Sequence, residues 1–448
     1  MAQDLRSFLA ALKESNDLGR ITREVDPRFE VAALMRRGAE QDAPALYFEH
    51  LRGKSIPLVA NVLASRRRLA RALATTADQL GRAYRAGLER PIAAVRVPGW
   101  AHPMRLASLE QLPIITANER DAGPYITAGV VFSEHPTSGR LNLSFQRMCP
   151  ISDDEIAIYV GETSGLAEHG QANGGRPLPV TVAIGLHPAF MFVAASWYPP
   201  EMDEIALAGG LLGEGVRLTQ DRLGRWTVPE AAEIVLEGEI DFARTVPEGP
   251  FGEYPGYYGA GTLKPRPSPV LKLHRMSARG NPIYQTVITG PTMSYESCYF
   301  SCLSKESMLF TVLSRMCPQV VKVNVLLSRY IAVVQIQGDI DDAEAHRLLE
   351  AVFVNMIYIK FAILIDSDVD PADALDVLWA LSTRVDPTRQ MHVFRDMPME
   401  PLDPSTNGRC DKVGFDARKP TGAEQEGFVR TRIPGFEHMR LEDYLTRG

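Results

Sequence analysis

The segment Val246–Gly261, VPEGPFGEYPGYYGAG, lies in the middle of this chain and is the stretch from which its fold is best approached. It carries two acids, Glu248 and Glu253, and no basic residue. Glycine reaches backbone angles closed to other residues, and proline fixes φ and lacks an amide proton, so this run favours irregular backbone. Two alternatives follow for the carboxylates on such backbone. Either both point into water, as most acids in loops do, or both point into one cavity.

Short β-rich runs surround this segment between residues 113 and 298. Turn residues separate the runs, which are YITAGVVFS, RLNLSFQRM, LPVTVAIGL, FMFVAASWY, AEIVLEGEID, PVLKLHRMS and PIYQTVIT. Many short strands with regular turns predict an antiparallel sheet or barrel. DEIALAGGLLG, which begins at Asp203, predicts a short helix that stops at glycine.

The two flanking regions alternate strand and helix patterns. Residues 1–112 and 299–448 therefore predict two α/β domains around the central one, and the fold class is α/β, or more strictly α+β. In residues 4–17, apolar side chains share one helical face. Residues 65–88 predict one basic amphipathic helix, with Arg66–Arg68 as a solvated face. The tail, PGFEHMRLEDYLTRG, predicts a last helix that packs on another subunit.

Composition narrows the class of protein. The chain has 448 residues, a net charge of −7 and 45% hydrophobic residues, which suits a globular protein and not a nucleic-acid binder. No apolar run approaches the roughly 18 to 20 residues of a membrane helix, and no signal peptide is recognised. Five cysteines, an odd number, predict reduced thiols and a cytoplasmic location. Cys298 and Cys302 lack the further ligands that a zinc site needs.

Common catalytic motifs are absent, so the candidates are scattered polar residues. There is no P-loop, nucleophile elbow, HExxH or dinucleotide fingerprint. Asn142 and Arg147 share a strand-like run, but an offset of five is no evidence that they face one site. Glu204 opens a helix, where an acid also suits the helix dipole. If one acid of the opening segment pairs with Arg147, the other, in an apolar pocket, has a raised pKa and moves a proton.

Several segments together resemble the UbiD family of decarboxylases that use prenylated FMN. They are DAGPYITAGVVFSEHPTSGRLNLSFQRM, LPVTVAIGLHP, DEIALAGGL, PEGPFGEYPGYY and DVDPADALDVLWALSTR, in the family's order over nearly the whole chain. The resemblance implies an N-terminal α/β domain (1–112), a central flavin-reductase-like split β-barrel that binds prenylated FMN (113–298), and a C-terminal α/β domain (299–448) whose tail helps to form a homodimer or a higher oligomer.

The resemblance also implies roles for single residues. Arg147 pairs with Glu248, and Glu253 protonates the product carbon. Asn142 and Glu204 bind a divalent metal, Mn2+ or alternatively Mg2+, which bridges to the cofactor phosphate. K+ is a further candidate ion.

Two more sets of contacts follow from the resemblance. Arg147 and Met148 lie at the cofactor, and Lys360 contacts its phosphate. The third metal ligand of the family is a histidine. Ungapped counting places Thr163 there, whereas the nearest histidine, His169, comes six residues later and is equally well explained as an exposed helix residue.

The implied activity is reversible, non-oxidative decarboxylation of an aromatic, heteroaromatic or α,β-unsaturated acid, with a flavin prenyltransferase supplying the cofactor. A catalytically silent or accessory flavin-binding homologue and an FMN oxidoreductase on a split barrel are the alternatives. The residues proposed to line the substrate pocket are Phe132, Phe251, Met293, Tyr295 and His392.

Overall fold

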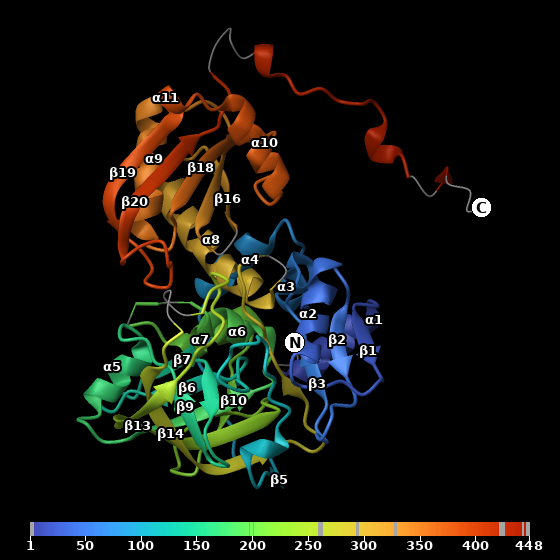
Figure 1. Cartoon of the computed structure of the whole chain (residues 1–448), viewed down its shortest axis with the longest axis vertical. Coiled ribbons are helices and arrows are strands. Elements are labelled where there is room, and N and C mark those ends of the chain that lie inside the picture. The colour runs from blue at the N-terminus through green and yellow to red at the C-terminus, as the bar shows by residue number, and fades with distance from the viewer. Residues whose placement is uncertain are drawn as a thin grey trace.

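The computed structural model describes residues 4–196, 198–199, 201–258, 263–292, 295–326, 329–420, 426–440 and 443–444. Within these residues the chain forms three main sheets, each covered by helices (Figure 1). The mixture of helices with a curled central sheet confirms the predicted fold class.

The N-terminal sheet has four strands in the order β1-β2-β3-β15. Its last strand comes from the central part of the sequence. The strands are β1 (Leu18–Ile21), β2 (Ala45–Phe48), β3 (Leu58–Ala60) and β15 (Tyr284–Gln285), and the helices are α1 (Leu5–Glu14), α2 (Glu30–Glu40), α3 (Arg66–Ala72) and α4 (Leu80–Leu88). The predicted apolar face of α1 is buried: Leu5, Phe8, Leu9 and Leu12 are at most 5% exposed.

The central sheet runs β7-β6-β10-β13-β14-β9-β8, with β5 on β14. Its strands are β5 (Met104–Arg105), β6 (Val130–Glu134), β7 (Leu141–Phe145), β8 (Met148–Pro150), β9 (Glu155–Ile158), β10 (Leu178–Ile184), β13 (Ile234–Glu248) and β14 (Arg266–Ala278). A small sheet joins β4 (Val95–Arg96), β11 (Arg217–Thr219) and β12 (Val228–Pro229). The remaining elements of this part are η1 (Leu109–Gln111), α5 (Gly165–Ala172), α6 (Pro188–Ala194) and α7 (Glu204–Leu212).

The long strand β13 curls the central sheet. Its pairing with β14 shifts register between Glu237 and Gly238 and again between Asp241 and Thr245, and each such irregularity bends and twists a strand. A side chain at Gly238 would lie 2.1 Å from the Lys272 carbonyl oxygen, so only glycine fits the first bend. The strand ends at Glu248, which the curl carries to the mouth of the half-barrel.

The C-terminal sheet has the order β16-β17-β18-β20-β19. Its strands are β16 (Val320–Leu326), β17 (Ile331–Ile336), β18 (Phe361–Asp366), β19 (Met391–Pro398) and β20 (Arg409–Asp416). Its helices are α8 (Glu296–Met316), α9 (Asp342–Asn355), α10 (Ala374–Arg384) and α11 (Pro387–Gln390). Helix α8 packs on β16 and α9 of this sheet and on α4 and α6 of the body below, so it links the two halves (Figure 1).

Three sequence expectations about local structure are wrong. FMFVAASWY was predicted as a strand, but most of it belongs to α6, which His187 caps and Pro188 starts. Every residue of α6 is buried, and an apolar run of that length does not distinguish a buried strand from a buried helix. Residues 65–88 form two helices, α3 and α4, because the chain turns at Ala74 with a φ of 49°.

The third error concerns Arg66–Arg68, which is not a solvated face. Arg68 is fully buried and donates to Asp17 at 2.8 Å. Arg67 also pairs with Asp17, at 3.1 Å, and Arg66 pairs with Glu306, at 3.2 Å. The triplet therefore ties α3 to the N-terminal loop and to α8.

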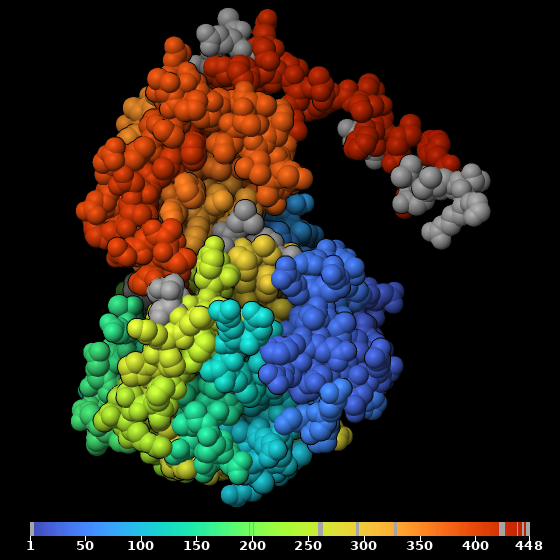
Figure 2. Space-filling model, viewed as in Figure 1, coloured from blue at the N-terminus to red at the C-terminus, as the bar shows by residue number. Residues whose placement is uncertain are grey.

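The tail after the C-terminal sheet stands clear of the body (Figures 1 and 2). Its described part contains two short 3-10 turns, at 426–428 and at η3 (Phe436–His438), and part of the predicted last helix lies outside the described residues. Large apolar side chains on it are 61% to 78% exposed, namely Val429, Ile433, Phe436, Met439 and Tyr444. All five cysteines are free thiols. In the described residues, no helix combines the length and apolar character that a bilayer-spanning segment needs.

Candidate active site

Arg147 stands at the centre of a buried ionic cluster. It lies in the short break between β7 and β8, so it does not share a regular strand with Asn142. Its Nε donates to Glu248 Oε1 at 3.0 Å and its Nη2 to Glu248 Oε2 at 2.7 Å, and its Nη1 donates to Glu253. The bidentate pair fixes the plane of the guanidinium group. The opening segment of the sequence therefore aims both acids at one arginine.

The two acids are held by different backbone. Glu248 ends β13, its side chain is fully buried, and it also accepts a hydrogen bond from the Tyr125 hydroxyl at 2.8 Å. Glu253 lies in a turn in which the Gly256 amide donates to the Glu253 carbonyl at 2.9 Å. Gly252 precedes it, and a side chain there would lie 2.3 Å from Asn118 Nδ2. Glycine thus lets the loop press against the turn that contains Asn118.

Aromatic rings close the cluster off from water. The Arg147 guanidinium lies 4.4 Å from the Tyr159 ring centroid and 5.1 Å from that of Phe251. Phe251 packs on Tyr125 with ring centroids 4.6 Å apart. Burial raises the pKa of Glu253, although the charge of Arg147 opposes the change. Glu253 is therefore the acid of the pair that is suited to hold and release a proton.

A narrow cavity adjoins this cluster. Tyr125, Thr127, Phe251, Ile288 and Thr289 are among its lining residues. The lining combines apolar and aromatic side chains with hydroxyl groups and with the side chains of Asn118 and Asp121. Apolar walls with a few polar groups are typical of sites that bind small ligands.

Asn142 and Glu204 form a second buried polar pair. Asn142 Nδ2 lies 3.2 Å from both carboxylate oxygens of Glu204, and the Leu143 amide donates to the same carboxylate. Asn142 Oδ1 is buried and has no hydrogen-bond partner in the part of the chain that the structure describes. Burial raises the pKa of Glu204 to about 7. Because amide and carboxylate oxygens are ligands of hard cations, the pair fits a divalent metal that would supply the missing partner.

The third predicted ligand, His169, makes no hydrogen bond to this pair among the described residues, but it contacts Ser133, which lies opposite Asn142 in the pairing of β6 and β7. His169 is fully buried and not exposed; its Nδ1 lies 2.9 Å from Ser133 Oγ, and its Nε2 lies 3.5 Å from Arg140 Nη2. Burial lowers its pKa to about 4, so the ring is neutral. Thr163 is exposed in the turn before α5. Among the described residues, no three histidine, cysteine or acidic side chains gather closely enough to hold a metal ion, so a site here would have to include the Asn142 amide oxygen.

Met148 and Lys360 are the two other predicted cofactor contacts. Met148 follows Arg147, is fully buried, and its backbone pairs with that of Ile126, which lies between the cavity-lining residues Tyr125 and Thr127. Lys360 Nζ lies 2.9 Å from Asp403 Oδ2 and also donates to Ser405 Oγ, within the C-terminal domain.

Of the four predicted pocket residues that the structure describes, Phe251 is the one that contacts the cluster. Phe132 is a core residue that packs on Phe190, 6.3 Å between centroids. Tyr295 precedes α8 with its ring 5.8 Å from the Arg36 guanidinium. His392 lies on β19, with its Nδ1 3.3 Å from that of His346. Met293 lies outside the described residues.

Sequence reasoning missed three contributors to the site. Tyr125 and Tyr159 lie in unremarkable strand-like runs, and Arg140 looked like an ordinary surface charge. Their roles arise from contacts across the sheet and over α5, which leave no local pattern. For Tyr125 a weak signal exists, since it lies within the first family-like segment, close to proline and glycine.

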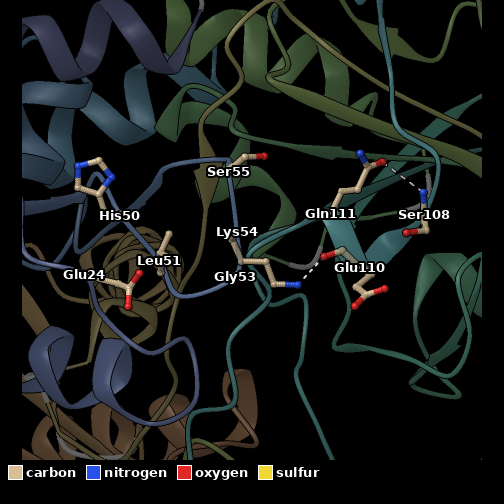
Figure 3. Close-up of a pocket in the computed structure, with 9 residues that line it drawn as sticks. All are labelled: Glu24, His50, Leu51, Gly53, Lys54, Ser55, Ser108, Glu110 and Gln111. Carbon is tan, nitrogen blue, oxygen red and sulfur yellow. Dashed lines mark hydrogen bonds between the residues drawn. The ribbon is translucent and has the colours of Figure 1, made fainter.

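A second hollow on the surface is separate from this site. Figure 3 shows it between Glu24 and residues 50–55 on one side and residues 108–111 on the other. Lys54 donates to the carbonyl oxygen of Glu110 across it. The nine residues drawn there include none of the predicted site residues.

The site and fold define a UbiD-class protein, and comparison with known families supports this. The models for the N-terminal, Rift-related and C-terminal domains of 3-octaprenyl-4-hydroxybenzoate carboxy-lyase match residues 9–86, 101–292 and 298–417. The chain belongs to the UbiD family, which confirms the resemblance seen in its motifs.

Solved structures of similar chains extend over its whole length. HmfF from Pelotomaculum thermopropionicum, a UbiD-class enzyme solved with FMN, is 31% identical, with 99% of this chain and 100% of that chain covered and a TM-score of 0.90. An evolved dimeric form of HmfF was solved with prFMN and has a TM-score of 0.88 at 30% identity and the same coverage.

Two further relatives are more distant. Vanillic acid decarboxylase from Sedimentibacter hydroxybenzoicus is 28% identical and has a TM-score of 0.83 in its open form, with 98% and 97% of the two chains covered. An uncharacterized protein from Archaeoglobus fulgidus is 29% identical, over 96% of this chain and 94% of its own.

Proposed function

We propose that this chain is a prenylated-FMN-dependent carboxy-lyase that reversibly removes CO2 from an aromatic, heteroaromatic or α,β-unsaturated carboxylic acid. The observation that carries the proposal is the buried cluster in which Arg147 binds both Glu248 and Glu253. Loss of CO2 from an unsaturated carbon leaves a carbanion that water does not stabilise. Prenylated FMN, when bound, supplies the electron sink for that charge.

Within this proposal the protein positions groups and moves one proton. Arg147 steadies the substrate carboxylate, and Glu248 with Tyr125 holds the guanidinium group in place. Glu253 carries the proton that replaces CO2 on the product carbon, and its raised pKa suits that task. The rings of Phe251 and Tyr159 keep water from the reacting carbon.

The second polar pair is proposed to anchor the cofactor. Asn142 and Glu204 would hold Mn2+, or Mg2+ in its place, against the flavin phosphate, because two like negative groups need a cation between them. K+ remains a candidate for a further ion, and Lys360 for a phosphate contact. A flavin prenyltransferase is the proposed source of the cofactor.

Assembly and location are part of the same proposal. We infer a cytoplasmic homodimer, or a higher homo-oligomer, in which the exposed apolar side chains of the tail pack on a partner subunit. These side chains are Val429, Ile433, Phe436 and Met439, which recur every three or four residues.

The test begins with the protein co-expressed with a flavin prenyltransferase and supplied with manganese. We expect an intact mass of prenylated FMN and an absorbance band shifted from that of FMN. Glu253→Gln should then lower CO2 release at least about 100-fold, because it removes the proton donor, while the bound flavin is unchanged. Glu119→Gln, at a side chain that is 81% exposed, is the control.

Other outcomes would contradict the proposal in distinct ways. Near-normal turnover by Glu253→Gln would eliminate Glu253 as the donor. A protein that takes up no flavin would favour the silent homologue. Bleaching of bound FMN by NADH would favour an oxidoreductase instead.

A further inference from the structure

Glu253 lies on a small hairpin, residues 250–258, that follows the end of β13. The hairpin closes on itself through a hydrogen bond from the Glu253 amide to the Tyr257 carbonyl oxygen at 2.9 Å. Phe251, near its start, has its ring centroid 5.1 Å from the Arg147 guanidinium, and Glu253 accepts a hydrogen bond from the same group. The residues on both sides of Gly252 therefore contact Arg147, so the placement of Gly252 sets the geometry of the cluster.

Hydrogen bonds fasten this hairpin to the segment before β6. The backbone amides of residues 120 and 122 donate to the Tyr258 hydroxyl at 3.2 Å and to the Pro250 carbonyl oxygen at 2.8 Å. Between these two contacts, Asp121 Oδ1 accepts a hydrogen bond from the Gly252 amide at 2.8 Å. Asp121 thus holds the hairpin at the residue that directly precedes the proposed proton donor.

The carboxylate of Asp121 uses both of its oxygens. While Oδ1 accepts from Gly252, Oδ2 accepts from the Asn118 amide at 2.9 Å and from Asn118 Nδ2 at 3.1 Å. Hydrogen bonds to an ionised acceptor are about twice as strong as those between neutral groups. An asparagine at position 121 would present one acceptor and one donor, so either the Gly252 side or the Asn118 side would lose its bond.

Glycine at position 252 lets the hairpin lie directly on the turn that contains Asn118. A side chain at Gly252 would lie 2.3 Å from Asn118 Nδ2. Gly252, Asn118 and Asp121 are also lining residues of the narrow cavity beside Arg147. A displacement of the hairpin at this point would therefore change the wall of the cavity as well as the position of Glu253.

Asp121 acts on Glu253 through the backbone. Among the described residues, no hydrogen bond joins the two side chains. Burial has the largest effect on the pKa of Glu253 and raises it, the charge of Arg147 comes next, and Asp121 is not among the leading influences. Asp121 is therefore placed to position the proton donor and not to exchange a proton with it.

We propose that Asp121 is a positioning residue of the reaction: its bond to the Gly252 amide fixes the hairpin so that Glu253 faces the reacting carbon. The proposal rests on the proposed function, because it concerns the residue that holds the proposed proton donor. A misplacement of a reacting group by about 1 Å can cost about 100-fold in rate. A single backbone contact next to Glu253 therefore has a measurable effect.

Two variants disturb this contact in different ways. Asp121→Asn removes one of the two acceptor oxygens, whereas Gly252→Ala keeps every charge and drives a methyl group into Asn118. Asp386→Asn is the matched control, because Asp386 Oδ1 accepts a hydrogen bond from the Thr388 amide at 3.0 Å at the start of α11, in the C-terminal domain. A retained melting temperature shows that a variant is folded, and the second variant guards against misfolding of the first.

Two measurements on the full-length protein, with and without flavin, need no turnover. Hydrogen exchange of a peptide covering residues 251–258 should be at least about tenfold faster in both variants. The infrared carboxyl band of Glu253, identified by its loss in Glu253→Gln, should titrate with a midpoint about one pH unit lower than in wild type. The midpoint falls because a loosened hairpin admits water, and burial is what raises the pKa of Glu253. The control should change neither result.

Turnover gives a third measurement. With flavin-loaded protein and an acid that wild type decarboxylates, both variants should lower kcat about 10- to 100-fold and leave KM and flavin absorbance within about twofold of wild type. A general loss of stability would lower the amount of active protein, and it would not shift the midpoint of Glu253.

The outcomes separate the positioning role from the proposed function. The role is wrong if exchange of the hairpin is unchanged in both variants, or if exchange rises and the midpoint of Glu253 stays the same or moves up. It is also wrong if both variants keep full turnover with a loosened hairpin. Absence of CO2 release by wild type from every acid tested contradicts only the proposed function, because exchange and the infrared midpoint still decide whether Asp121 places Glu253.

Discussion

Glu296 should make the stability of this protein fall as the pH rises. It opens α8, is 0% exposed, and accepts a hydrogen bond from the Leu63 amide at 2.8 Å, while its Oε2 is buried without a hydrogen-bond partner among the described residues. Burial raises its pKa from 4.5 to about 7, against the opposing effects of the Leu63 amide and the charge of Arg68. The folded protein therefore favours the protonated carboxyl group.

The sign and size follow from this pKa. A carboxyl group whose pKa is raised by folding gives its full stabilisation below the unfolded value of 4.5, and loses it as the pH passes the folded value of about 7. The difference corresponds to about 3 kcal/mol in total, of which about 2.5 kcal/mol is lost between pH 5 and pH 8.5. Glu296→Gln keeps the acceptor for Leu63 and removes this dependence.

Urea unfolding of wild type and Glu296→Gln at both pH values measures the effect. The free energy of unfolding of the variant, minus that of wild type, should be about 2.5 kcal/mol larger at pH 8.5 than at pH 5. Taking the difference cancels the other titrating groups, and Glu119→Gln should show no such change. A difference that stays constant with pH would refute the reasoning, because it would mean that Arg68 or water stabilises the Glu296 carboxylate fully in the fold.

Two further predictions test the proposed metal site and the proposed role of the C-terminal tail in assembly. Glu204→Gln should weaken flavin retention after gel filtration at least about tenfold, as loss of a metal ligand does, and treatment of wild type with a chelator should have the same effect. Equal retention with and without metal would contradict the proposed metal site at Asn142 and Glu204. Deletion of residues 426–448 should lower the oligomeric mass measured by light scattering, because it removes the exposed apolar side chains of the tail; an unchanged mass would contradict a role of the tail in assembly.

The sequence predicts elements whose determinants are local. The apolar face of α1 needs only the spacing of Leu5, Phe8, Leu9 and Leu12, and the end of α7 needs only Gly213, whose φ is 76°. Prediction from local pattern fails for the run Arg66–Arg68. A run of charge normally faces water, and nothing near Arg68 in sequence reveals that Asp17, 51 residues away, is its buried partner.

The residues of the candidate site show the same difference between local and long-range determinants. Family motifs single out Arg147, Glu248 and Glu253, and the structure brings all three together. The metal site is less well predicted, because the position of α5 depends on its packing against β6 and β7, which no local pattern reveals. That packing places His169 against Ser133, the residue opposite Asn142 in the sheet.

The pKa of Glu253 is set by charges from both sides of the site. Burial raises it, and the charge of Arg147 is the largest effect that lowers it. Arg329, before β17, and Arg266, on β14, lower it further, whereas Glu248 raises it. Because the cations come from two parts of the fold, the proton affinity of the proposed donor depends on how the C-terminal part packs against the half-barrel, and a variant that removes Arg329 should raise the pKa of Glu253 further.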